Sequence, residues 1–394
     1  MKLSVLLPTR NRLTLLRYAI ESVRRQDVPD WEIIVSDNHS EEDIAGYIRG
    51  LGDGRIKYFR TQAPLPVTDN WNQALEHSSG DYVIMLGDDD CLLPGYLRQI
   101  RQLAEKNGQP DLIYSAGYIY AYPGVVPGYP NGYLHRTGCA EFFAEQHQPF
   151  LLDRATARRM VDCSLRFQAR FEYNMQYSTI SRRIIDALRS YGPLFQSPFP
   201  DFYASNALLL KAQRILVCPD PLVVIGISPK SYGFYHYNRQ ESDGIAFLQC
   251  FPDQVSAERL KQIVLPGSNM NTNWLFAMET LRSNFGAEFG LQINYQRYRQ
   301  LQLLNYCQER YMENSLSPGD VAEISSRLRW HERAFCHGLV PLGRLFGRKG
   351  VKRILRWPRR WLAQYAHWDR AMVTRKFTDI LDACTHIDAR DTPA

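Results

Sequence analysis

The chain has 394 residues, of which 45% are hydrophobic and 22% charged, and its formal net charge is +6. This length predicts two domains, and the mixed composition excludes a disordered or fibrous protein. The window from Pro341 to Arg360 holds eight Lys or Arg and no acid, so it carries +8 and the remaining residues sum to −2. A nucleic-acid groove across the larger part of the chain is therefore disfavoured.

The eight cysteines are scattered, without a CxxC pair or zinc-ligand spacing. This pattern predicts free thiols in a reducing compartment. The apolar run Leu3–Leu7 is too short for the core of a signal peptide, and Pro8 ends it. No stretch approaches the roughly 20 apolar residues that span a bilayer. We expect a cytoplasmic protein that is not integral to a membrane.

Short apolar runs alternate with helical periodicity over the first 115 residues. The strands are expected at 3–7, 32–35, 56–59, 82–86 and 111–115, and the helices at 13–26, around 44–48, at 70–76 and at 94–108. Such alternation predicts an α/β fold with a mostly parallel sheet covered by helices on both faces.

Three consecutive aspartates, Asp88, Asp89 and Asp90, follow the apolar run 82–86 and Gly87. Adjacent carboxylates raise one another's pKa unless a cation or water offsets their charge. Mg²⁺ and Mn²⁺ prefer oxygen ligands of this kind, and ligands of open α/β sheets gather at the carboxyl ends of strands. The triplet is thus a candidate metal site, and a solvated acidic turn is the alternative.

No Gly-x-Gly-x-x-Gly follows the first strand, and no Walker loop occurs in the chain, which disfavours dehydrogenases and P-loop enzymes. Several short segments do occur in a characteristic order and spacing within the first hundred residues. They are 5–11 (VLLPTRN), 34–38 (IVSDN), 70–74 (NWNQA), 80–83 (GDYV) and 87–90 (GDDD), with Pro94 behind them. Together they resemble family 2 glycosyltransferases of the GT-A fold.

The resemblance implies an inverting transferase that uses a nucleotide-diphospho-sugar and Mn²⁺ or Mg²⁺. By position, it implies nucleotide contacts from Pro8, Thr9, Arg10, Asp37, Asn70 and Asp88. It further implies a metal ligand at Asp89, with Asp88 and Asp90 beside it. For Asp37, the alternative is an Asx turn at the end of a strand.

Two positions depart from the family pattern. Arg10 stands where members often carry Tyr, so the guanidinium would stack on the base. Gly87 stands where the Asp-x-Asp-Asp pattern begins, so metal coordination would depend on residues 88–90. Both departures leave the nucleotide open.

Asp201 lies between Pro200 and an aromatic residue at the start of an expected helix. An acid can be held rigidly at such a helix N-terminus. Single-step inversion needs one general base near the acceptor hydroxyl, and the resemblance places that base here, although Pro200 replaces the usual preceding acid. An N-cap aspartate is the alternative. Glu172 and Asp186 are weaker candidates for the base.

Two segments rich in aromatic residues are expected to be loops. The stretch 118–136 contains many Gly, Pro and Tyr without periodicity and predicts a long loop at the acceptor rim or on the surface. Closing strands are expected at 216–219 and 221–227. In the segment that follows, the resemblance makes Lys230 and His236 candidates for contact with the diphosphate or metal.

Beyond about residue 243 the pattern changes to helices, which predicts a GT-A domain over 1–240 and a helical domain over 241–394. Within the helical domain, the segment 341–362 interleaves Trp, Leu and Arg. This pattern is typical either of an interfacial segment drawn to anionic lipid or of a solvated basic helix.

The sequence thus predicts a hexosyl- or deoxyhexosyltransferase that acts on a glycan or lipid-linked acceptor in bacterial surface polysaccharide synthesis. Its expected location is the cytoplasm, where it could dock on the inner face of the membrane. Two other functions stay open: an inactive nucleotide-sugar-binding or membrane scaffold, and a sugar-1-phosphate nucleotidyltransferase. Binding to nucleic acid is not expected.

Overall fold

The computed structural model describes residues 1–137, 146–237, 260, 262–265, 269–310, 316–338 and 372–391. The chain divides into two compact units. The first comprises residues 1–161, 171–250 and 367–394, and the second comprises 162–170 and 251–366.

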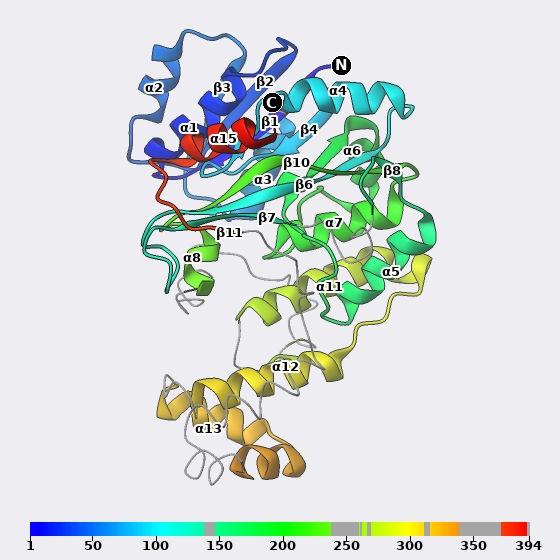
Figure 1. Ribbon diagram of the computed structural model, residues 1–394. Helices are drawn as coiled ribbons and strands as arrows, with labels where there is room; N and C mark the ends of the chain where they lie inside the picture. Colours follow the sequence, from blue (N-terminus) through cyan, green and yellow to red (C-terminus); the bar gives the residue numbers. More distant parts are fainter. Residues whose placement is uncertain are drawn as a thin grey trace. The chain divides into compact units, whose positions relative to one another are not determined.

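The core of the first unit is a parallel sheet built from the apolar runs of the N-terminal region (Figure 1). Its strands lie in the order β3–β2–β1–β4 and are all parallel. Their bounds are β1 Leu3–Thr9, β2 Trp31–Asp37, β3 Ile56–Arg60 and β4 Tyr82–Met85. The intervening helices are α1 Leu13–Arg24, α2 Ile44–Leu51 and α3 Val67–Glu76. The predicted α/β class with a mainly parallel core is confirmed.

Antiparallel strands extend this core on the side of β4. Strand β9 (Ser178–Ser181) lies between β4 and β6 (Leu112–Ala121) and is antiparallel to both. Strand β10 (Ile215–Ile227) runs parallel to β6 and is one long strand with an irregularity after Cys218, instead of the two expected strands. No local pattern announced β9, because its partners are distant in sequence.

The predicted loop over 118–136 was wrong. Strand β6 continues to Ala121, and β7 (Tyr133–Thr137) returns antiparallel to it, so the stretch is a hairpin. Its Gly and Pro residues are concentrated in the connection 122–132. The tyrosines that suggested a loop instead pack in the sheet, as the burial of Tyr120 and Tyr133 shows.

The other elements of the first unit connect these strands. The strands are β5 Cys91–Leu92 and β8 Phe150–Leu151. The helices are α4 Tyr96–Lys106, α5 Arg154–Leu165, α6 Arg182–Leu188, α7 Pro200–Lys211 and α8 Tyr232–Tyr237. Two 3-10 turns lie at Met175–Tyr177 and Arg189–Tyr191. Helix α5 continues into the second unit at its last residues.

The C-terminal residues also belong to the first unit, whereas the sequence assigned them to the helical domain. Strand β11 (Met372–Val373) pairs with β7, and α15 (Ile380–Asp391) lies beside α1 (Figure 1). The reason is hydrophobic: Phe377, Ile380 and Ile387 are buried in a cluster with residues of β5 and β10.

The second unit is helical, as predicted, with α11 Asn269–Phe289, α12 Tyr295–Gln308, α13 Pro318–Arg327 and a helix over residues 330–338. Trp274 is fully buried beside Phe167 and donates its indole N–H to the carbonyl of Ser164 at 3.1 Å. Among the described residues, no helix is long and apolar enough to cross a bilayer. The basic segment 341–362 lies outside the described residues.

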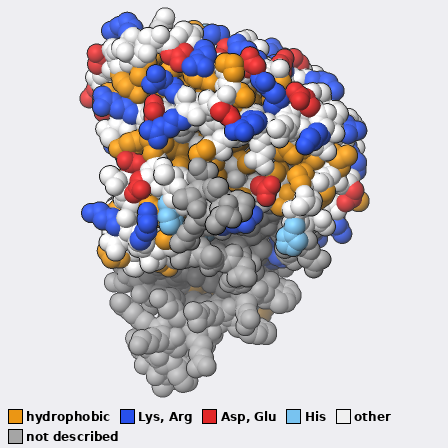
Figure 2. Space-filling view, turned by 45° about the horizontal axis from the view of Figure 1, so that its top comes forward, with side chains coloured by type: hydrophobic (Ala, Val, Ile, Leu, Met, Phe, Trp, Pro, Cys, Tyr) orange, Lys and Arg blue, Asp and Glu red, His pale blue; other side chains and the backbone are white. Residues whose placement is uncertain are grey.

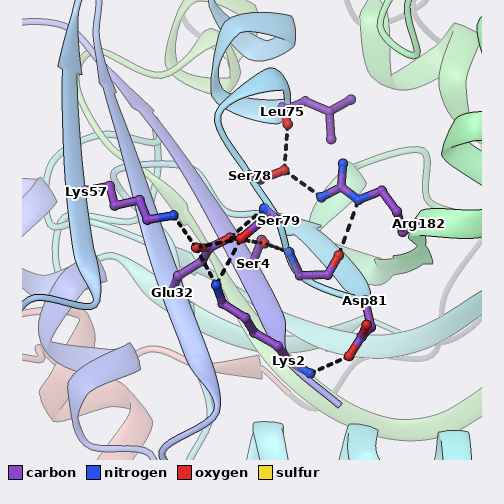
Figure 3. A network of polar contacts seen from close by, with 10 residues as sticks. Lys2, Ser4, Glu32, Lys57, Leu75, Ser78, Ser79, Asp81 and Arg182 are labelled. Carbon is purple, nitrogen blue, oxygen red and sulfur yellow. Dashed lines mark hydrogen bonds and ion pairs between the residues drawn. The ribbon is translucent and has the colours of Figure 1, made fainter.

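A buried carboxylate fixes the amino-terminal edge of the parallel sheet (Figure 3). Glu32 in β2 is 2% exposed and accepts hydrogen bonds from Lys2 and Lys57, both at 2.7 Å. Ser4 and Ser79 donate to its other oxygen at 2.7 and 2.6 Å. Although burial opposes ionisation, these donors hold the pKa of Glu32 well below its usual range. The network joins β1, β2, β3 and the turn before β4.

We predict that Glu32→Gln lowers the free energy of unfolding by about 1–2 kcal/mol, because the buried carboxylate that accepts from two partly exposed ammonium groups is lost. Since the folded-state pKa is depressed, the stabilisation is present above the unfolded-state value and declines as pH falls below about 4. Urea unfolding at neutral and acidic pH measures both effects. The exposed pair Asp186–Arg189 supplies the control, because Asp186→Asn should change stability by less than about 0.5 kcal/mol. Equal effects of the two variants would contradict the prediction.

Candidate active site

Polar residues converge at the carboxyl edge of the parallel core, opposite the Glu32 network. In the register of β1 and β2, Thr9 lies beside Asp37, and both residues end their strands. Strand β4 pairs with β1 on its other side and leads into Gly87 and the three aspartates. Parallel strands bring these ends together, so residues about 80 positions apart become neighbours.

Asp88 is held by two donors, one from the last residue of β1 and one from the turn that follows. Its carboxylate is 3% exposed, and Thr9 donates its hydroxyl to Oδ2 at 2.7 Å. The guanidinium of Arg12 donates to Oδ1 at 2.9 Å from a side chain that is itself only 8% exposed. Although burial opposes the charge of Arg12, the nearby aspartates raise its pKa above the ordinary value. Asp88 and Arg12 therefore form a buried ion pair.

Asp89 has a different environment. Ser228 donates its hydroxyl to Oδ2 at 2.7 Å, and Arg12 lies 3.9 Å from the same oxygen. Burial and the charge of Asp88 raise the pKa of Asp89, against the opposing influence of Arg12. Among the described residues, the side chains that contact the Asp89 carboxylate do so at Oδ2, and its own backbone N–H also lowers its pKa. Within that part of the chain, Oδ1 of Asp89 is the carboxylate oxygen of the Asp88–Asp89 pair that no neighbouring side chain engages.

Asp90 fastens the turn rather than facing a ligand. Its Oδ1 accepts from the amide of Gly226 at 2.8 Å, and its Oδ2 accepts from Gly87 N at 2.8 Å and Gln176 Nε2 at 2.5 Å. Burial and the charge of Asp89 raise the pKa of Asp90 to about 8. Position 226 requires glycine, because a Cβ there would lie 1.9 Å from the carbonyl oxygen of Asp89. Strand β10 thus passes directly against the aspartate turn.

Arg12 also joins two loops that are distant in sequence. Its second guanidinium nitrogen donates to the carbonyl of Lys230, and Lys230 Nζ donates to the carbonyl of Asn11 at 2.6 Å. Together with the Ser228–Asp89 bond, these contacts connect the segment after β10 to the turn after β1 and to Asp89.

The residues assigned to the nucleobase lie at this edge with partners of their own. Asp37 is 1% exposed; its Oδ1 accepts from Ser40 N at 2.9 Å and its Oδ2 from the Tyr58 hydroxyl at 2.6 Å. Burial, and then Asp37, raise the pKa of Tyr58. Asn70 in α3 is bonded through its amide to Ser36, at 2.7 and 3.3 Å, and so fixes the end of β2. Pro8 and Arg10 flank Thr9 and are partly buried.

Asp201 lies in the first turn of α7, as the sequence predicted. Its Oδ1 accepts the amide N–H of Phe202 at 3.0 Å, and burial raises its pKa to about 6. An aromatic cluster connects this turn to the segment after β10. In it, Phe199 contacts Phe202 at 5.1 Å and Tyr232 at 5.3 Å between ring centroids. Tyr232 opens α8, two residues after Lys230.

The weaker base candidates lie elsewhere. Asp186 is on the surface of α6 and pairs with Arg189. Glu172 is joined to the Tyr114 hydroxyl through its backbone N–H and carbonyl. His236 lies in α8, but its side chain is outside what the structure describes.

Sequence reasoning missed three residues of this site. Arg12, Ser228 and Gln176 each bond one of the aspartates. The motif 87–90 identified the three aspartates in the sequence, but no sequence pattern identified the residues that donate hydrogen bonds to them. Arg12 lies one residue beyond the N-terminal motif 5–11, where it reads as an ordinary turn residue.

A divalent metal can be tested against this arrangement. Among the described residues no group of three or more His, Cys, Asp or Glu side chains could hold a metal ion by itself. Mg²⁺ and Mn²⁺ are commonly held by one or two carboxylates together with substrate phosphates and water. The available oxygen of Asp89 fits that mode, and the engaged oxygens of Asp90 do not.

These features define an α/β protein with a polar site at the carboxyl edge of its sheet. Residues 4–168 match the model of glycosyl transferase family 2. The match lies in the N-terminal part of the chain, which is similar to this family over those residues.

Two curated relatives are bacterial proteins named as glycosyltransferases. A "GalNAc(5)-diNAcBac-PP-undecaprenol beta-1,3-glucosyltransferase" of Campylobacter jejuni is 44% identical over 27% of this chain and 35% of that protein. A "Putative colanic acid biosynthesis glycosyl transferase WcaA" of Escherichia coli is 26% identical over 61% of this chain and 81% of that protein. The chain therefore spans about a third of the first relative's length.

Among solved structures, Staphylococcus aureus TarS 1–349 is similar at 17% identity with a TM-score of 0.47, over 86% of this chain and 92% of that one. The same protein in complex with UDP-GlcNAc is similar at 16% identity with a TM-score of 0.46, again over 86% and 92% of the two chains.

We predict that Arg12→Gln exposes the segment after β10 to protease. The variant loses a charge-assisted contact to the Lys230 carbonyl worth about 1.5 kcal/mol, so trypsin cleavage after Lys230 should accelerate about tenfold relative to cleavage elsewhere in the chain. Limited proteolysis with mass spectrometry measures this ratio.

Arg10→Gln is the matched control, because it removes the same charge two residues away and should leave the ratio unchanged. The same cleavage ratio in the Arg12 variant and the wild type would show that Arg12 does not hold the segment.

Proposed function

We propose that this chain transfers a hexosyl or deoxyhexosyl group from a nucleotide-diphospho-sugar to a hydroxyl of a glycan or lipid-linked acceptor, with inversion at the anomeric carbon. The observation that carries the proposal is that the segment after β10 reaches both groups: Ser228 bonds Asp89, and Tyr232, four residues later, contacts Phe199 beside the turn that holds Asp201. A donor-binding pair of acids and a candidate base thereby belong to one site.

Asp201 is suited to the role of general base. A carboxyl with a pKa of about 6 is ionised at neutral pH and still basic enough to take up a proton. As the acceptor oxygen attacks the anomeric carbon, its proton passes to Asp201. The bond from that carbon to the diphosphate breaks, and its electron pair leaves with the nucleoside diphosphate.

On the donor side, Asp88 and Arg12 stabilise the turn, and the free oxygen of Asp89 would hold Mn²⁺ or Mg²⁺ against the diphosphate. Such an ion offsets the charge that develops on the leaving group. Asp37, Thr9, Arg10 and Pro8 would surround the nucleobase, although Asp37 must share oxygens that already accept two hydrogen bonds.

The acceptor class rests on the relatives. Besides the Campylobacter jejuni protein, a "UDP-Glc:alpha-D-GlcNAc-diphosphoundecaprenol beta-1,3-glucosyltransferase WfgD" of Escherichia coli is 27% identical over 26% of this chain and 42% of that protein. Acceptors of this kind are anchored in a membrane. The basic segment 341–362 would suit a location at the cytoplasmic face, where anionic lipid attracts Lys and Arg.

The alternatives have less support. A scaffold without turnover does not need a buried carboxyl with a raised pKa such as that of Asp201. The turn 8–12 lacks the glycines expected of a sugar-1-phosphate nucleotidyltransferase. On the face in Figure 2, Lys and Arg are interspersed with Asp and Glu across the described residues, without the basic stripe typical of nucleic-acid binding.

We predict that Asp201→Asn lowers kcat about a thousandfold, because proton removal from the acceptor is lost. In the wild type, activity should rise with pH up to about 6 and level off above it, as Asp201 becomes ionised. Transfer from UDP-glucose to GlcNAc-diphosphoundecaprenol with Mn²⁺, followed by mass spectrometry of the lipid, is the first assay, and other nucleotide-sugars follow.

Asp186→Asn is the control, since this exposed acid of α6 should tolerate the change with full activity. Undiminished turnover by the Asp201 variant would remove Asp201 from the chemistry. A wild type that binds a nucleotide-sugar but neither transfers nor hydrolyses it would favour the scaffold.

A further inference from the structure

The second unit carries an exposed aromatic pair. Among the described residues, the large hydrophobic side chains that are exposed are Leu151, Trp330 and Phe335, at 48%, 81% and 44%. Two of the three lie on the helix of residues 330–338. A Trp exposed to this extent, with a Phe nearby, is unfavourable in water and marks a candidate contact surface.

The opposite side of this helix is fixed to its own unit. Glu332 is 7% exposed and forms a two-pronged ion pair with Arg299, at 2.6 and 2.7 Å. One turn later, Cys336 is 2% exposed and contacts Cys307, with 3.3 Å between the sulfur atoms. Because this face is held by a buried ion pair and by packing, the helix cannot rotate to bury Trp330.

The exposed side of the helix is also cationic. Arg329 and Arg333 are exposed, together with His331 and His337. The guanidinium of Arg333 donates to the carbonyls of Leu328 and Ser326, which carry no charge.

The scarcity of Asp and Glu in this part of the sequence also makes the exposed side of the helix cationic. Glu332 is the one acid between positions 329 and 338, and Arg299 neutralises it on the buried side. The chain then continues toward the window 341–360, which adds eight Lys or Arg and no acid. We call residues 329–338, with Trp330, Phe335, Arg329 and Arg333 outward, the aromatic-basic face.

We propose that the aromatic-basic face docks on an anionic lipid surface. Trp and Phe lie favourably at the level of the lipid headgroups, and Lys or Arg beside them gain from the negative surface potential. The sequence favours lipid over a protein partner, because the same combination of Trp and basic residues recurs at 352–361. This proposal goes beyond the transfer reaction and holds whether or not Asp201 is the base.

The test is co-sedimentation of the full chain with phosphatidylcholine vesicles, with and without added phosphatidylglycerol. The variant Trp330→Ala/Phe335→Ala should bind the anionic vesicles about tenfold more weakly and keep the dependence on salt, since it loses apolar insertion. The variant Arg329→Gln/Arg333→Gln should bind them about twentyfold more weakly and lose part of that dependence, at a factor of about five per arginine.

Matched controls come from the first unit. Leu151→Ala removes a hydrophobic side chain about as exposed as Phe335, and Arg49→Gln/Arg98→Gln removes two exposed charges. Both variants should bind vesicles as the wild type does. The variant Trp330→Ala/Phe335→Ala should bind nucleotide with unchanged affinity. A nucleotide-binding measurement therefore distinguishes damage to the donor site from loss of vesicle binding.

Wild-type vesicle binding by both variants of the aromatic-basic face would overturn the proposal. So would a loss confined to Lys352→Gln/Arg353→Gln, because the basic segment alone would then make the contact. A change in the sedimentation coefficient of Trp330→Ala/Phe335→Ala without a change in vesicle binding would assign the face to contacts between copies of the chain.

Discussion

Three consecutive carboxyl groups lie buried at the end of β4, with exposed fractions of 3%, 7% and 2% for Asp88, Asp89 and Asp90. Removing such charges from water is costly unless donors or cations replace the lost hydration. The chain supplies them from four separate segments: Thr9 and Arg12 at and just after the end of β1, Gly87 within the turn, Gln176 before β9, and Gly226 and Ser228 at the end of β10. The need to supply donors to these buried carboxyl groups therefore determines which segments meet at the carboxyl edge of the sheet.

The three acids differ in what their oxygens contact. Asp90 uses both oxygens to secure the turn, Asp88 is paired with Arg12, and the side-chain contacts of Asp89 reach its Oδ2. Arg12 couples the acids to the segment that follows β10, and that segment reaches Asp201 through aromatic contacts. A nucleoside diphosphate bound at Asp89 would therefore contact a segment whose aromatic residues pack against the turn that holds the candidate base.

Much of this could be predicted from local sequence. The apolar runs of β1, β2 and β4 specified a parallel core, and the position of the aspartates after β4 specified the edge at which they lie. Their donors could not be predicted, because Ser228 and Asp89 are 139 positions apart and a lone Ser or Arg has no periodicity. The hairpin of β6 and β7 and the return of α15 to the first unit were missed for the same reason. Both depend on long-range pairing and burial, which leave no local pattern.

The central claim is that Asp89 and its neighbours form a donor site, and isothermal titration calorimetry tests it most directly. Nucleoside diphosphates would be titrated into the wild type and into Asp89→Ala, each with and without Mn²⁺, after thermal unfolding has shown that both proteins are folded. The account predicts that one nucleotide binds in a Mn²⁺-dependent manner and that the variant binds it at least about tenfold more weakly. Mn²⁺-independent binding of equal strength by both proteins would contradict it, as would no binding of any nucleotide by the wild type.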